Sequence, residues 1–153
     1  MDRYELLKFV HVIAAMIWVG GVLMAQALMI RARRTGDRAH TAAVAAHIGD
    51  LGKRILLPAS LTVVVAGFLL IWDGPWTLGM EWVWVSLILF AVSLVAGIGY
   101  FEPEGKRLAA LLASEEGAFA EVEQRIARTL RLSHLDFLLL VSIVFLMVTK
   151  PGV

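Results

Sequence analysis

The sequence predicts an all-α fold, a bundle of four transmembrane helices with two helices extended into the cytoplasm. Of its 153 residues, 59% are hydrophobic. Soluble domains are closer to half apolar, so the excess apolar surface is expected to face lipid. Crossing a bilayer takes roughly 20 mostly apolar residues. Four segments meet this requirement, and together they predict a single integral-membrane domain over residues 1–153: they are residues 6–30, 55–72, 82–101 and 132–149.

The segments between these spans predict the topology. Eleven of the fourteen basic residues lie in two connections, residues 31–54 and 102–131. The positive-inside rule places both connections in the cytoplasm and both termini outside, in a cytoplasmic (inner) membrane. Such basic segments are typical of contacts with anionic lipid headgroups, and we expect no nucleic-acid partner.

The same connections contain helical patterns of their own. Residues 40–55 are rich in alanine, and residues 115–132 have apolar residues at helical spacing. We therefore expect the second and fourth helices to begin in the cytoplasm. The short turn at residues 73–81 then faces outside, where four tryptophans form an expected aromatic belt: Trp72, Trp76, Trp82 and Trp84.

His11 is the one ionisable residue in the apolar run from Phe9 to Ile30 of the first span. Such a residue is a functional-site hypothesis by default. Ala14, Ala15 and Trp18 follow at i+3, i+4 and i+7 and share its helix face. Small residues leave room for a flat ligand that Trp18 can wall, so one interpretation makes His11 an axial ligand of haem iron. The other is a histidine that only hydrogen-bonds to a neighbouring helix.

The second axial ligand is not another histidine. His134 opens the fourth span at the cytoplasmic side, ~20 Å from His11 along the membrane normal at ~1.5 Å rise per residue. Metal–nitrogen bonds of ~2 Å exclude both from one iron. Met147, near the outer end of the fourth span, is the best-placed sulfur. Otherwise the iron is five-coordinate, or its ligand comes from another subunit of a homo-oligomer.

A second group of candidates lies on the cytoplasmic side. His47 precedes the second span near Asp50, and His134 opens the fourth span near Asp136. They form either a second metal or haem site, a proton path, or ordinary ion pairs with neighbouring basic residues. Asp136 is expected to face inward toward a partner such as Arg54, because a carboxylate facing lipid is costly.

Three short motifs resemble a known family. They are KFVHVIAAMIWVGG at residues 8–21, the spacing from Pro58 to Gly67, and VFLMVTKPG at residues 144–152. In this order they are similar to predicted integral-membrane proteins of unknown function related to HemJ-type protoporphyrinogen oxidases. They resemble the CopD-type membrane domain of copper-resistance proteins to a lesser degree. The resemblance covers nearly the whole chain and implies the same four spans.

The HemJ resemblance implies haem b bound at His11. His11, Trp18 and Gly20 stand where HemJ-type proteins have a first-span histidine, tryptophan and glycine, and the final Lys-Pro matches at Lys150. This lysine is expected to pair with a haem propionate.

The third span departs from the HemJ pattern. Its WxHxK context is replaced by Trp82, Val83, Trp84, Val85 and Ser86, so the histidine and the lysine are both absent. The resemblance therefore indicates an uncharacterised sister family and does not extend to protoporphyrinogen oxidase activity.

Three functions remain open on the sequence. The first is a haem b-binding redox protein that exchanges electrons with a quinone or another small redox partner. In this function the chain would be a membrane oxidoreductase. The second is a copper- or metal-handling transport module of CopD type, with a path along His11, Met16, Met24 and Met147. The third is a cofactor-free structural membrane protein. Because the chain has no cysteine, thiolate metal sites and cysteine nucleophiles are excluded.

Overall fold

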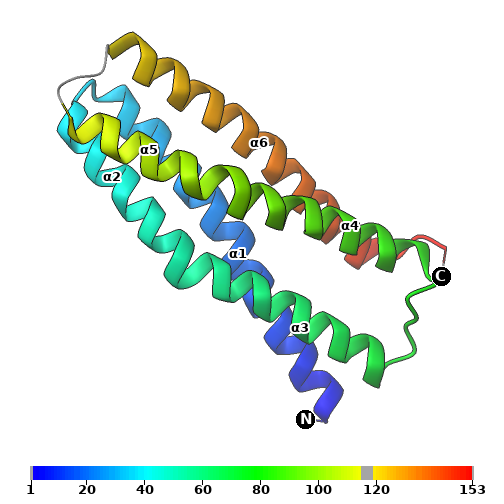
Figure 1. Ribbon diagram of the computed structural model, residues 1–153. Helices are drawn as coiled ribbons and strands as arrows, with labels where there is room; N and C mark the ends of the chain where they lie inside the picture. Colours follow the sequence, from blue (N-terminus) through cyan, green and yellow to red (C-terminus); the bar gives the residue numbers. More distant parts are fainter. Residues whose placement is uncertain (1, 115–118, 153) are drawn as a thin grey trace.

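The computed structural model describes residues 2–114 and 119–152, and every regular element in this part of the chain is helical (Figure 1). The elements are α1 (Arg3–Arg34), α2 (Arg38–Leu51), the π-helical turn η1 (Gly52–Leu56), α3 (Leu57–Asp73), α4 (Glu81–Ala96), the π-helical turn η2 (Gly97–Phe101), α5 (Glu102–Ala113) and α6 (Phe119–Thr149). α2 runs through η1 into α3, and α4 runs through η2 into α5. The first residues of the predicted fourth helix, 115–118, lie outside the described residues.

Four continuous helices are long and apolar enough to cross a membrane, which confirms the predicted fold class. They are Arg3–Arg34, Arg38–Asp73, Glu81–Ala113 and Ala120–Thr149. Each helix exposes large apolar side chains on the surface of the bundle: Phe9, Val65, Val95 and Phe145 are all more than half exposed. A soluble protein buries such residues, whereas lipid-facing helices expose them. α5 adds an extension to the third span that the sequence analysis did not anticipate.

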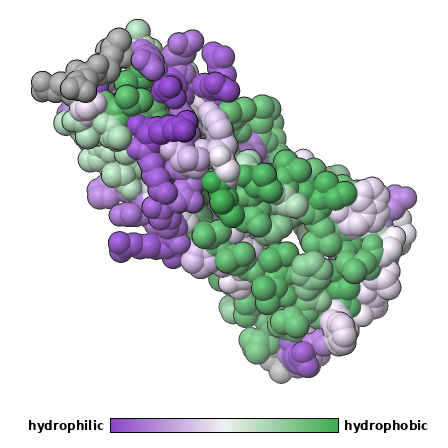
Figure 2. All heavy atoms as spheres, viewed as in Figure 1, coloured by the Kyte–Doolittle hydropathy of each residue, from purple (hydrophilic) through white to green (hydrophobic). Residues whose placement is uncertain are grey.

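The two ends of the bundle differ in chemistry. Both termini and the turn between α3 and α4 lie at one end, here called the terminal end (Figure 1). The other end, here called the basic end, is formed by α2, α5, residues 31–34 of α1 and residues 120–131 of α6. Figure 2 shows hydrophilic residues gathered at the basic end, while hydrophobic residues cover most of the remaining face in view.

Packing between the helices changes along the bundle. At the basic end α2 packs on α5, whereas α3 packs mainly on α1, and α4 mainly on α6. α1 also packs on α6. α3 and α4 diverge as they approach the terminal end (Figure 1).

Each π-helical turn comes directly before a helix that carries proline in its first turn, Pro58 in α3 and Pro103 in α5. Proline has no N–H, and its ring displaces the carbonyl four residues earlier. The turn before Pro58 is wider than an α-helical turn: at η1, the Leu57 N–H donates to the Gly52 carbonyl, five residues back. The second span therefore carries a π bulge before Pro58 and stays one continuous helix.

The basic end has its own small core, which explains why the helices extend beyond the apolar spans. Buried side chains of α2, α5 and α6 form this core: Ala45, Leu108, Leu112, Val122 and Ile126. At its edge the Arg33 guanidinium donates to both carboxylate oxygens of Glu123, with a shortest distance of 2.7 Å. This pairing holds the pKa of the Glu123 carboxyl below its usual range. Both groups lie outside the apolar spans, so the ion pair ties α1 to α6 beyond the membrane.

Candidate functional site around His11

His11 is held by a backbone carbonyl of a neighbouring helix. It lies half-buried on α1, and its Nδ1 is 2.9 Å from the Val63 carbonyl oxygen of α3. A carbonyl oxygen only accepts, so Nδ1 carries the hydrogen of this bond. In the neutral ring, Nε2 then carries the free lone pair. Metal-ligating histidines are typically fixed in this way, with the second ring nitrogen bonded to a carbonyl or carboxylate.

Gly67 lets the imidazole lie against α3. A Cβ atom at this position would come within 3.3 Å of His11 Cε1 and 3.5 Å of Nδ1. The glycine lies one helical turn after Val63, on the same face of α3. The Pro58–Gly67 spacing noted in the sequence therefore ends at the residue on which the histidine ring packs.

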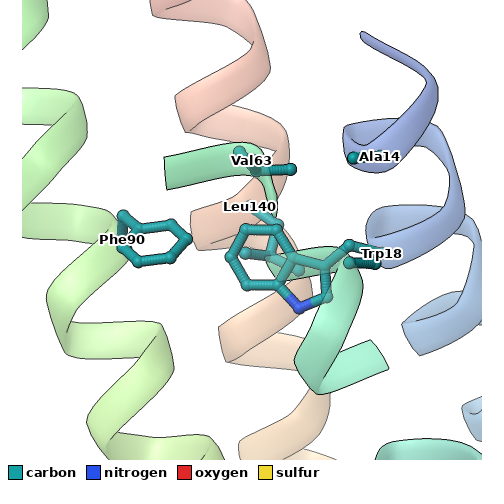
Figure 3. Close-up of a cluster of buried hydrophobic side chains, with 6 residues drawn as sticks. Ala14, Trp18, Val63, Phe90 and Leu140 are labelled. Atoms are coloured by element: carbon teal, nitrogen blue, oxygen red, sulfur yellow. The ribbon is translucent and has the colours of Figure 1, made fainter. Parts of the chain in front are cut away.

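Trp18 is a core residue of the bundle. It is 9% exposed and packs with Ala14, Val63, Phe90 and Leu140, which come from all four spans (Figure 3). Its ring meets Phe90 edge-on at a centroid distance of 5.2 Å. The indole thus fills the centre of the bundle, two turns from His11. The role of Trp18 as a wall for a flat ligand stays a prediction.

Met147 lies at the depth of His11, and His134 does not. The Gln26 amide donates to the Ser133 carbonyl at 2.8 Å, which fixes the register of α1 against α6. His11 is fifteen residues from Gln26, ~22 Å along the axis, and Met147 is fourteen residues from Ser133, ~21 Å in the same direction. His134 adjoins Ser133 and is therefore ~20 Å from His11. The shared depth of His11 and Met147 and the different depth of His134 both agree with the sequence analysis.

Trp82 lies at the same depth and has an unsatisfied donor. Asp136 of α6 lies beside Ser93 of α4. Trp82 lies eleven residues from Ser93 on α4, and Met147 lies eleven residues from Asp136 on α6. Both intervals are ~17 Å toward the terminal end, so Trp82 and Met147 are at the same depth. The Trp82 side chain is 5% exposed, and among the residues that the structure describes its buried Nε1–H has no hydrogen-bond partner. Buried polar groups are nearly always satisfied, so this donor needs an explanation.

An aromatic cluster covers the terminal end of the bundle, beyond the depth of His11. Trp76 meets Trp82 edge-on at 5.3 Å and donates its Nε1–H to the Tyr4 hydroxyl at 2.9 Å. The Lys150 ammonium lies 4.1 Å from the centroid of the Trp76 ring. Of the four belt tryptophans, Trp72 is 87% exposed, but Trp82 is buried. The expected belt is therefore partly an internal cap that joins α1, the α3–α4 turn, α4 and the C-terminal residues.

Ser86 occupies the place of the lysine in the resembled motif. It is almost fully buried, and its hydroxyl donates to the Trp82 carbonyl of the same helix at 2.6 Å. The Ser86 hydroxyl is thus hydrogen-bonded within α4.

A second polar level lies between His11 and the basic end. It comprises Gln26 with Ser133 and Asp136 with Ser93. Asp136 therefore lies beside a serine, rather than the arginine that the sequence suggested. Gln26, 5% exposed, was not among the sequence candidates. An amide inside an apolar span was the signal that could have identified it.

The candidates on the cytoplasmic side, His47, His134 and Asp136, do not form a cluster that could hold a metal ion. His47 and His134 are both exposed, and His134 Nδ1 bonds the Leu130 carbonyl of its own helix at 2.6 Å. Within residues 2–114 and 119–152, no group of three or more histidine or acidic side chains is placed to hold a metal ion. Met16 and Met24 of the copper path are 65% and 57% exposed and point away from the interior that His11 faces.

Comparison with known proteins gives one match. A family model described as "Predicted integral membrane protein (DUF2269)" covers residues 5–151, nearly the whole chain. No curated protein and no solved structure matches. The resemblance to HemJ-type and CopD-type proteins therefore rests on the short motifs alone.

Proposed function

The chain belongs to the DUF2269 family of predicted integral membrane proteins, and on this premise we propose that it binds haem b in the membrane with His11 as an axial ligand. The observation that carries the proposal is the His11–Val63 hydrogen bond. It fixes the tautomer and orientation of the ring and leaves the Nε2 lone pair for iron.

Three further features support a ligand at this depth. The Trp82 indole has a buried donor without a partner, which a polar group of the ligand would satisfy. Met147 offers a thioether at the same depth as a possible second axial ligand. Lys150 supplies a cation at the terminal end, where the carboxylates of a haem would be exposed to water.

Space for the macrocycle is proposed between α3 and α4. These helices pack mainly on α1 and α6 and not on each other. Two cavities lie at the basic end, and neither reaches His11. Haem entry thus requires side chains between α3 and α4 to move apart, without breaking the α1–α3 or α4–α6 contacts.

The bound haem would supply one-electron redox chemistry. The chain itself orients the imidazole through Val63 and excludes water with the Trp18 core and the aromatic cap. A quinone or another small molecule dissolved in the membrane is the proposed electron partner. We place the basic end in the cytoplasm, and hence His11 in the outer half of an inner membrane, from the positive-inside rule.

The test is the visible spectrum of matched histidine variants. His11→Ala, purified in detergent after expression with haem supplied, is expected to lose the Soret band. His134→Ala is the control, since its ring is exposed and bonds only its own helix, and it should retain the band. Circular dichroism checks that both variants keep their helix content. An unchanged spectrum in His11→Ala would remove His11 as the ligand.

A further inference from the structure

A cavity at the basic end lies far from His11. It has a volume of about 730 Å³ and opens between α5 and α6 beside η2. Ligand pockets generally fall between ~300 and ~1,000 Å³. Its charged lining consists of four arginines and two glutamates: Arg107, Arg125, Arg128, Arg131, Glu104 and Glu121. The lining therefore has an excess of two positive charges.

The two glutamates are already engaged. Arg125 bonds the buried carboxylate of Glu104 at 3.1 Å and Glu121 at 3.4 Å. Arg107 lies 4.0 Å from Glu104. These contacts form the wall of the cavity and join α5 to α6.

Arg128 and Arg131 supply the excess charge. Both are exposed, and neither has an ion pair with any residue that the structure describes. They are three residues apart on α6 and so share a face. Two unpaired guanidinium groups at one cavity favour an anion with several oxygens, because each presents a fork of N–H donors.

The cavity lies where the apolar surface begins. The face of α6 that carries Arg128 and Arg131 continues, at helical spacing, through Leu135 and Leu138. These leucines are 62% and 60% exposed. A lipid with its phosphate among the arginines would thus lay an acyl chain along this leucine face. A free anion would leave the face bare.

We propose that this cavity binds the headgroup of an anionic phospholipid, with Arg128 and Arg131 holding the phosphate. Basic pockets between transmembrane helices are known to recognise such headgroups. Anionic lipids fit the excess positive charge, whereas a phosphocholine headgroup carries a cation of its own into an arginine-rich site. The inference does not depend on haem binding at His11.

The proposal is tested by lipid competition on the purified full chain. Native mass spectrometry in an equal mixture of phosphatidylglycerol and phosphatidylcholine is expected to show retained phosphatidylglycerol, with a preference of about thirtyfold from the two arginines. Arg128→Gln with Arg131→Gln should abolish this preference. Arg31→Gln with Arg54→Gln removes the same charge at the same end, outside the cavity, and should leave it intact.

Several outcomes would overturn the proposal. An equal retention of both lipids by the unaltered chain is one, and it needs no variant. A preference that survives loss of Arg128 and Arg131 is another. If glycerol 3-phosphate displaces the lipid at equal concentration, the site takes a free phosphate and the leucine face plays no part. If the glutamine pair fails to fold, Arg128→Lys with Arg131→Lys keeps the charge and must keep most of the preference.

Discussion

Replacing Gly67 with alanine will weaken haem binding by about ten- to a hundredfold, the usual cost of disturbing a group that orients a metal ligand. The new methyl group would meet the imidazole of His11 at 3.3 Å. The ring must then move by a few tenths of an ångström and lose its alignment with the Val63 carbonyl. Haem titration of the apoprotein in detergent measures the change.

The matched control is Gly20→Ala. Gly20 is also in the interior of a membrane helix, and a Cβ atom there meets nothing within 4 Å. Alanine is the better helix former by about 1 kcal/mol, so neither substitution should destabilise the helices themselves. Equal haem affinity in the two variants would show that the packing of His11 on Gly67 does not matter for binding.

Replacing Trp18 with alanine will lower the free energy of unfolding by about 3–5 kcal/mol, as for other large-to-small changes in a packed core. Trp18 packs with residues of all four spans (Figure 3). Membrane helices associate mainly through such packing, because the hydrophobic effect does not drive apolar side chains out of lipid. Unfolding by sodium dodecyl sulfate in mixed micelles, followed by circular dichroism, measures the loss.

Trp72→Ala serves as its control. This tryptophan is 87% exposed, and its removal should change the unfolding free energy by less than about 0.5 kcal/mol. If the two variants were equally stable, Trp18 would not be a centre of packing in the bundle.

The spans could be predicted because the membrane imposes their length and composition. α5 was missed for a local reason: its first residues, Glu102 to Gly105, include proline and glycine, which usually mark a break. Proline is tolerated in the first turn of a helix, and the π-helical turn η2 lets α4 continue into α5. The apparent loop is therefore part of one continuous helix.

His11 could be singled out because an ionisable residue in an apolar span is conspicuous. Its partner could not, since Val63 contributes a backbone carbonyl and Gly67 contributes the lack of a side chain. The partner of Asp136 was wrongly expected to be a basic residue such as Arg54. Which residues of two helices meet depends on their register, and the Asp136–Ser93 contact follows from α4 packing on α6.

The central claim is that this chain holds haem through His11, and the most direct measurement is haem quantified per chain in the unaltered protein. Protein purified in mild detergent from haem-sufficient cells is predicted to show a Soret band that shifts on reduction, with haem and chain in equal amounts. A colourless, folded protein that takes up no added haem would contradict the account.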